Sequence, residues 1–421
     1  MYLCGKSTEL VRVACKSPPQ PTSNPVSWPT FCACVQVQQD AIPQSTLVAI
    51  EDYSIGRLMR SRRRLRRALL VRLHGGEDAV DLGLVVLRLL RVRRDSSRCV
   101  ARTWAVSSSS FNINSFSTEE SLSLFGFKPA DVRCVAGLLE VQGGSSRRRY
   151  KATPVEKLCV VLRRLSSPAR WRDLEILFGR GRSSLCELFY ETIEQVDMSC
   201  SGLLCSWRGD LMEERAEMYA QRVLEKGGAL DNCVGFIDGT GLFVARPGGA
   251  LQRSVYSGHK RTHMLKFQTV TTPDGLIFHL YGPVEGRRHD ITMYCEAGMD
   301  YMLQAGLRTG GIQYCMYGDK AYLIRPWMQV AFPAPLGGEA DADEDTPNTD
   351  MAGLRVSVEW GYKEVKQVFT SLDFKRKLKI REGPVALVYR CAALLWNMRT
   401  CLYGSQTASF FRRDPPDLEN Y

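Results

Sequence analysis

The stretch CVGFIDGTGLF, residues 233–243, is an apolar run interrupted by one acid, Asp238. A second apolar run, IQYCMYGD at residues 312–319, ends in Asp319. Short runs rich in Val, Ile, Phe and Tyr predict buried β-strands. Acids that follow strands converge at one edge of a sheet when those strands are neighbours. We therefore expect Asp238 and Asp319 to lie close together.

The segments around these runs predict a mixed sheet covered by helices. LKFQTVTT and LIFHLYG flank Pro273-Asp274-Gly275, a sequence typical of a hairpin turn. After a loop expected at residues 333–350, helices are predicted from about Leu354 to Leu372 and from after Gly383-Pro384 to about Tyr403. Strands followed by helices indicate an α/β domain, which we place at residues 230–405.

Residues 111–200 are expected to be all helical and to contain a helix-turn-helix. Thr153 and Pro154 start one helix, and the next is predicted at residues 170–178, where Gly179 ends it. Gly181 bends the chain, and Ser183 or Ser184 is expected to cap a third helix. Helix, short turn and helix is a layout of DNA-binding proteins, so Arg180 and Arg182 are candidate DNA contacts.

The third acid of interest is Glu359, in the helical segment RVSVEWGYKEVKQVF at residues 355–369. An apolar stripe recurs at helical spacing and predicts a buried face: Val358, Tyr362, Val365 and Phe369. A second stripe adjoins it: Arg355, Glu359, Tyr362 and Lys366. A helix packed on the sheet edge would present Glu359 to the two aspartates, with its lysines facing outwards.

Three carboxylates suit the cleavage of a phosphodiester bond. Two divalent ions about 4 Å apart activate water and stabilise the leaving oxygen, and hard oxygen ligands hold them. Asp238, Asp319 and Glu359 are thus candidate catalytic residues and ligands for two Mg²⁺ or Mn²⁺ ions. Each acid alone also has a structural interpretation: a turn aspartate, a helix cap, and a helical partner of Lys363.

The order of the motifs resembles the PIF/Harbinger-type DDE endonucleases, which include transposases and domesticated nuclease relatives. The resemblance rests on GFIDGTGLFVARP (235–247), SVYSGHKRTHMLKFQTVTTPDGLI (254–277), GPVEGRRHD (282–290), YGDKAY (317–322) and residues 355–369. It covers about Phe111 to Tyr403. It implies an RNase H-like fold with Asp238, Asp319 and Glu359 as metal ligands. It also implies a separate DNA-binding partner protein and a nuclear location.

Three features near these motifs need separate interpretation. Ala321 replaces the usual glycine of the second aspartate motif, beside an intact Asp319. Asp290 follows GRRH at a recurrent family position, and we interpret it as a capping or positioning residue. The acidic stretch EADADED at 339–345 is interpreted as a solvated surface insertion, because a flexible loop is a poor place for rigid coordination.

Charge and composition favour a polyanionic partner. The chain of 421 residues has a net charge of +11, which favours DNA. Lys260, Arg261, Lys363 and Lys366 are candidate phosphate contacts. Residues 1–110 are rich in Pro and Arg, and GRLMRSRRRLRRALLVRLH is either a solvated arm or a patch for phosphate binding or nuclear import.

The remaining composition excludes some other classes. Fifteen scattered cysteines favour reduced thiols, and neither the Cys32–Cys34 pair nor His259 with His263 has the further ligands of a zinc site. No apolar run reaches the roughly 18 residues of a membrane span, so we expect a soluble intracellular protein. The sequence thus predicts a metal-dependent DNA endonuclease or transposase, and the alternative is a domesticated DNA-binding or scaffold protein that no longer cuts.

Overall fold

The computed structural model describes residues 111–144, 151–331 and 342–421. The side chains of residues 342–349 and of Val358 are outside this description. The predictions for residues 1–110, including the arginine-rich segment and the Cys32–Cys34 pair, also fall outside the described residues. All the described residues belong to a single contact unit, so their packing can be considered together.

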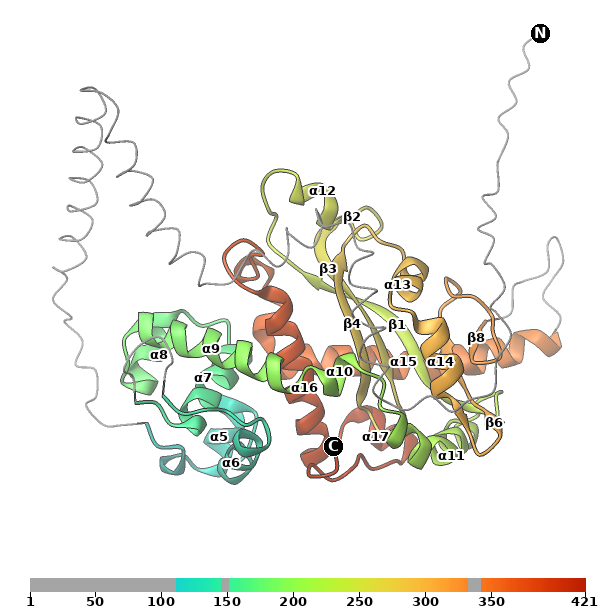
Figure 1. The fold of residues 1–421 in the computed structure, drawn as a ribbon, viewed down its shortest axis with the longest axis horizontal. Coiled ribbons are helices and arrows are strands. Elements are labelled where there is room, and N and C mark those ends of the chain that lie inside the picture. The colour runs from blue at the N-terminus through green and yellow to red at the C-terminus, as the bar shows by residue number, and fades with distance from the viewer. Residues whose placement is uncertain (1–110, 145–150, 332–341) are drawn as a thin grey trace, which may run out of the picture. The chain divides into compact units, whose positions relative to one another are not determined.

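A mixed sheet lies at the centre of the predicted α/β region (Figure 1). β1 (Cys233–Phe243) pairs antiparallel with β3 (Thr262–Thr271), which also pairs with β4 (Ile277–Glu285) and with the short β2 (Tyr256–Ser257). On its other edge β1 runs parallel to β7 (Cys315–Gly318), which runs parallel to β8 (Met328–Val330). A separate ribbon joins β5 (Arg308–Thr309) to β6 (Ile312–Gln313). This mixed arrangement confirms the predicted fold class and is consistent with an RNase H-like α/β fold.

Helices cover both faces of the sheet. One face packs against α11 (Gly209–Glu225), α13 (Asp290–Glu296) and α14 (Met299–Gly306) through a cluster that includes Ile237 and Met316. The opposite face packs against α15 (Ala342–Val368) and α17 (Gln406–Phe411) through a cluster that includes Phe236 and Tyr317. Because side chains alternate along a strand, the even-numbered residues near Asp238 share the face of Phe236.

The described parts of this region, residues 111–144 and 151–200, are mainly helical, as predicted. A 3₁₀ turn (Ile113–Ser115) precedes α5 (Thr118–Phe125), which begins with a capping box of Ser117 and Glu120, and α6 (Pro129–Leu138) follows the turn FGFKP. Thr153 caps α7 (Pro154–Ser166), α8 (Trp171–Phe178) ends at Gly179, and α9 is Arg182–Cys200. The short α10 (Gly202–Cys205) leads towards the sheet.

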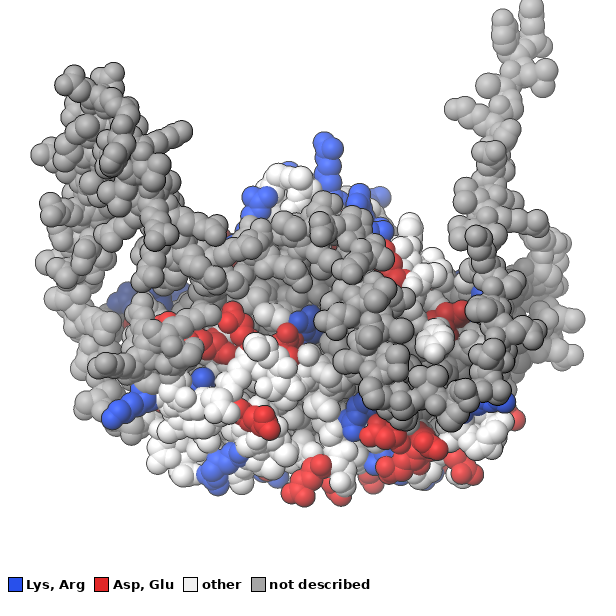
Figure 2. Space-filling model, in the orientation of Figure 1, with Lys and Arg blue, Asp and Glu red and all other residues white. Residues whose placement is uncertain are grey.

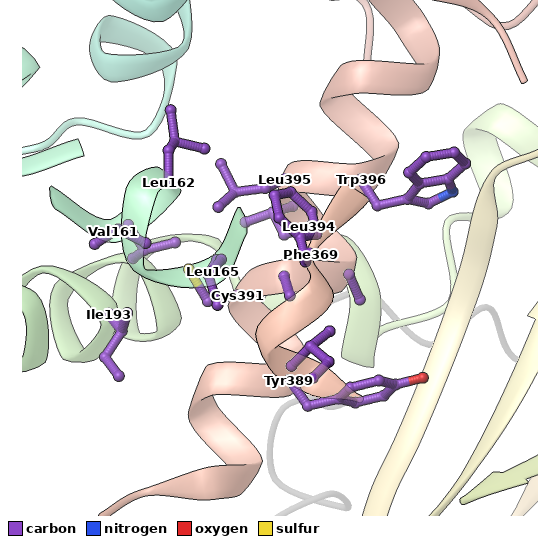
Figure 3. Packing of buried hydrophobic residues seen from close by; sticks show 14 of the residues in the cluster. Val161, Leu162, Leu165, Ile193, Phe369, Tyr389, Cys391, Leu394, Leu395 and Trp396 are labelled. Carbon is purple, nitrogen blue, oxygen red and sulfur yellow. The ribbon is translucent and has the colours of Figure 1, made fainter. Parts of the chain in front are cut away.

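α16 (Val385–Tyr403) joins the helical region to the sheet. Figure 3 shows its residues Leu394 and Leu395 toward Leu162 and Leu165 of α7, while Tyr389 points toward the strands of the sheet; all of them belong to one buried cluster. The Tyr389 ring also packs on Phe267 of β3, with the ring centres 4.4 Å apart. Burial on several sides confirms the apolar helix predicted after Pro384, and Gly404 is its C-cap.

Four predicted boundaries were wrong. β1 continues through Asp238 to Phe243, because its pairing with β3 extends from Phe236 to Phe243. The single strand predicted over 312–318 is divided into the short β6 and β7. α9 is capped by the backbone of Gly181, not by Ser183 or Ser184. α15 starts at Ala342, so the part of the acidic stretch after residue 341 is helical where a loop was expected.

The helix that carries Glu359 is held along one side by the C-terminal segment. The Thr407 hydroxyl donates to the Ser357 carbonyl at 3.0 Å, and the Gln406 N–H donates to Glu364 at 3.2 Å. The Trp360 and Phe410 rings pack edge to face, with centres 5.2 Å apart. After α15, two 3₁₀ turns, η3 (Thr370–Leu372) and η4 (Lys375–Lys377), lead to α16.

Candidate metal and DNA site

Asp238 and Asp319 lie side by side on adjacent parallel strands. The last paired residues of β1 and β7 are Ile237 and Gly318, and each aspartate is the next residue. Neighbouring strands are about 4.8 Å apart, so the two aspartate backbones are close neighbours. Asp238 comes two residues after Phe236, and Asp319 comes two residues after Tyr317; both aromatic residues belong to the cluster beneath α15. Strand alternation places Asp238 on the α15 face, and Asp319 follows where the strand ends.

The carboxyl group of Asp238 is in an environment that opposes its negative charge. Burial is the main cause that raises the pKa of Asp238 to about 6, and the charges of Asp290 and Asp319 add to that rise. The Arg355 guanidinium and the Gly239 N–H lower the same pKa by smaller amounts. A half-buried carboxylate beside two other acids favours a cation, because a cation offsets both desolvation and repulsion.

One stripe of α15 faces β1. The Arg355 Nη1 atom is 3.7 Å from Asp238 Oδ1, and the Tyr362 hydroxyl bonds to Thr269 and lies 3.5 Å from the Asp238 carbonyl. The Lys366 ammonium is 5.4 Å from the centre of the Phe243 ring. Glu359 is one turn after Arg355 and three residues before Tyr362, so it belongs to this stripe. Its side chain is exposed, as a group bordering an open site would be.

The donor chemistry fits a hard divalent cation. Carboxylate oxygens are the ligands that Mg²⁺ and Mn²⁺ prefer, and Asp238 and Asp319 offer them from neighbouring strands. Among residues 111–144, 151–331 and 342–421, however, no three His, Cys, Asp or Glu side chains are gathered closely enough to hold a metal ion. The backbone thus places two aspartates together, while the Glu359 side chain does not join them in a finished coordination shell.

Asp290 lies on the opposite face of β1 and is held by a lysine. The Lys266 ammonium is 2.6 Å from Asp290 Oδ1 and donates to the Arg288 carbonyl at 2.8 Å. Gly239 leaves room for this carboxylate, because a Cβ at that position would be 2.5 Å from Asp290 Oδ1. The capping interpretation of Asp290 was wrong, since His289 is the N-cap of α13 and Asp290 is its first residue.

Sequence reasoning missed several residues of this site. Lys266 lies between the apolar residues Leu265 and Phe267 in a predicted strand, and that was a usable signal, because a lysine enclosed by a sheet is usually paired. Gln268 is fully buried and donates to the Tyr322 hydroxyl at 3.0 Å. Arg355 was assigned to the correct stripe, but its proximity to Asp238 depends on how the helix packs. No local pattern reveals that packing.

The candidate DNA contacts are in different environments. Arg180 forms an ion pair with the buried Glu156 and donates to the Lys151 carbonyl at 2.7 Å, so its guanidinium has structural partners. Arg182 is exposed at the start of α9. Lys260, Arg261 and Lys363 are exposed as well. Lys366 does not face outwards as predicted, since it is half-buried over Phe243, and burial lowers the pKa of its ammonium.

Comparison with known proteins gives one positive finding. No curated protein and no solved structure matches this chain. In the part of the chain that the structure describes, no helix is long and apolar enough to cross a membrane. One family does match, and its range begins at Ile237 and ends within α16, so it includes all three candidate acids in order. Residues 237–397 match the family described as DDE superfamily endonuclease, and this part of the chain is a domain of that superfamily.

Proposed function

We propose that this chain is a divalent-metal-dependent DNA endonuclease in which Asp238, Asp319 and Glu359 are the metal ligands. The observation that carries the proposal is the stripe of α15. Arg355 and Tyr362 on either side of Glu359 both contact Asp238, and Asp319 is its strand neighbour. A helix face that meets the aspartate pair and bears an exposed acid between two contacts is the arrangement that a three-carboxylate site requires.

The chain's own residues then have distinct tasks. Asp238 and Asp319 bind from one face of the sheet, and Glu359 binds from the helix. When bound, divalent ions supply Lewis acidity that activates water and stabilises the leaving oxygen. Asp290, held by Lys266 behind Gly239, fixes the backbone next to Asp238. Lys363 is exposed one turn after Glu359 and contacts the phosphate backbone beside the site, together with Lys260, Arg261, Lys366 and the helix-turn-helix residues Arg180 and Arg182.

The proposal extends to the PIF/Harbinger type within the superfamily, on the motifs of residues 235–290 and 317–322. In that case the freed 3′-hydroxyl would attack target DNA in a strand-transfer step. A separate DNA-binding partner protein and a nuclear location belong to the same proposal. So do the predicted domain limits, 1–110, 111–200 and 230–405.

A second candidate function is a DNA-binding or scaffold protein that no longer cuts. It is favoured by one observation: the nearest cation to Asp238 Oδ1 among the described ion pairs is the Arg355 guanidinium. Such a protein would use this ion pair to stabilise the fold, and the acids would have no metal-dependent task.

Metal binding and cleavage by matched variants separate the two functions. Asp238→Asn, Asp319→Asn and Glu359→Gln are each expected to weaken Mn²⁺ binding in calorimetry and to abolish nicking of supercoiled plasmid in Mg²⁺. Asp350→Asn is the control, because Asp350 is exposed on the same helix about 180° from Glu359. Wild-type levels of Mn²⁺ binding in the three site variants would contradict the proposal and favour the non-cutting protein.

A further inference from the structure

Two segments far apart in the sequence meet beyond the end of β1. The first, residues 244–263, contains α12 (Leu251–Val255) and leads from β1 to β3. The second, residues 373–382, contains η4 and leads from α15 to α16. The Ala245 N–H donates to the Leu378 carbonyl at 2.9 Å. A Cβ added to Gly249 would be 3.3 Å from the guanidinium of Arg381.

These segments carry a strong excess of positive charge. Residues 244–263 contain four Lys or Arg and no Asp or Glu, and residues 373–382 contain five Lys or Arg and two acids. One of the acids, Glu382, is paired with Lys379 at 2.9 Å. We name the remaining exposed cations the basic surface: Arg246, Arg253, Lys260, Arg261, Lys375, Arg376 and Arg381. Within the described residues, none of these seven forms a salt bridge.

The two segments contribute charge to one place. The pKa of His263 is lowered by burial and then by the charges of Arg246 and Lys375, one from each segment. Figure 2 shows Lys and Arg side chains gathered at the top of the view, where α12 and β2 lie in Figure 1. Unpaired like charges repel one another and destabilise the folded state, so such a surface suggests a polyanionic ligand.

The basic surface is aligned with the candidate site. β1 carries Asp238 and ends five residues later at Phe243, which corresponds to roughly 17 Å of strand. Successive phosphates of one strand advance by about 3.4 Å along the duplex axis, so along that axis the basic surface starts roughly five nucleotides from the aspartates. Lys366, over the ring of Phe243, adds a cation at the end of β1 where the basic surface starts. A duplex cut at the acids would therefore extend onto this surface.

We propose that the basic surface binds the phosphates of double-stranded DNA that flanks the cleaved bond. The proposal rests on the proposed function and adds where the flank is held. The surface lacks the long helix that reads bases in a major groove, since α12 has only five residues. It therefore positions the duplex without selecting a sequence, as contacts to phosphates do.

The test measures binding in EDTA, where no cleavage occurs, by fluorescence anisotropy of a 30-base-pair duplex at several salt concentrations. The variant Arg246→Gln, Arg253→Gln, Arg376→Gln and Arg381→Gln is expected to bind at least about tenfold more weakly. The slope of log affinity against log salt should become shallower by about 4, one for each lost phosphate contact. The same four arginines changed to Lys should keep the wild-type slope, because they keep the charge.

Matched controls separate this surface from general charge. Arg133→Gln with Arg308→Gln removes two exposed arginines of α6 and β5 and should leave the slope unchanged. Unchanged binding by the four-glutamine variant overturns the proposal, and so does an equal loss per removed arginine in the control. Equal loss of affinity for single-stranded RNA and duplex DNA would also overturn the commitment to duplex. If only the proposed cleavage function is wrong, the result is distinct. Asp238→Asn and wild type would then bind DNA equally, and neither would cut it.

Discussion

The raised pKa of Asp238 predicts that metal binding is strongly dependent on pH. A carboxylate must be deprotonated to bind Mn²⁺, so affinity falls once the pH drops below its pKa. With the pKa of Asp238 at about 6, only about one-tenth of the metal-free protein is ionised there at pH 5. We therefore expect Mn²⁺ affinity to fall about tenfold between pH 7.5 and pH 5. An aspartate with the ordinary pKa of 3.8 would cause almost no change over this range.

Arg355 gives this prediction a second signature. Its guanidinium, 3.7 Å from Asp238 Oδ1, lowers the pKa of Asp238. In Arg355→Gln that pKa rises, so the midpoint of the pH profile should move to higher pH. At pH 8 the same variant should bind Mn²⁺ more tightly than wild type, because a competing cation is gone. A merely structural role for Arg355 would not both raise the midpoint of the pH profile and tighten Mn²⁺ binding at pH 8.

The assay is calorimetric titration of Mn²⁺ at pH 5 to 8 in buffers that do not bind the metal. Asp350→Asn should follow the wild-type profile, since Asp350 is exposed on the far side of α15. A profile that is flat from pH 7.5 to pH 5 would refute the reasoning about Asp238. A midpoint for Arg355→Gln at or below the wild-type value would refute the reasoning about Arg355.

Three further changes test single contacts in different parts of the fold, each by urea unfolding. Gly239→Ala places a Cβ 2.5 Å from Asp290 Oδ1 and should lower the free energy of unfolding by about 1–3 kcal/mol. Burial lowers the pKa of His279 to about 4 in the folded state, from 6.5. The unfolded state therefore binds the extra proton as pH falls from 6.5, so wild type should lose about 2 kcal/mol between pH 7 and pH 5 that His279→Gln does not lose. Arg180→Met leaves the buried Glu156 unpaired and should cost about 3 kcal/mol.

Matched variants control for these three changes. Gly248→Ala adds a Cβ with nothing within 4 Å and should be close to neutral. His259 is exposed, so His259→Gln should keep the full pH dependence. Arg182→Met removes an exposed arginine near Arg180 and should cost little. An equal effect of any variant and its control would show that the assigned contact is not the cause.

The local patterns predicted the elements well and their tertiary partners less well. The capping signal at Thr153, the hairpin at Pro273 and the stripe of α15 depend on neighbours in sequence, so sequence reveals them. The path of β1 through Gly239 and Gly241 was missed. These glycines suggest a turn, but Gly239 leaves space for Asp290, and Gly241 leaves space for the Met264 sulfur, which a Cβ would approach to 2.8 Å.

The candidate site shows the same division. The sequence indicated that the two aspartates follow strands, because apolar runs precede them, but their adjacency depends on the register of β1 with β7. The pairing of Lys266 with Asp290 joins residues 24 positions apart in sequence. The start of α15 at Ala342 was hidden because its first turns are acidic and contain Pro347, a composition that resembles a loop.

The contacts of α15 with the C-terminal segment affect where the boundary of the nuclease-like domain should be drawn. The family match ends at Asn397, whereas Thr407 and Phe410, which hold the helix near Glu359, lie beyond it. A fragment limited to the matched range would keep all three acids. It would lose the contacts of Thr407 and Phe410 that hold α15 and so orient Glu359. The range that matches the family, residues 237–397, is thus shorter than the range needed to orient Glu359. Exchange of this domain between relatives would therefore succeed only if the C-terminal segment with α17 is exchanged as well.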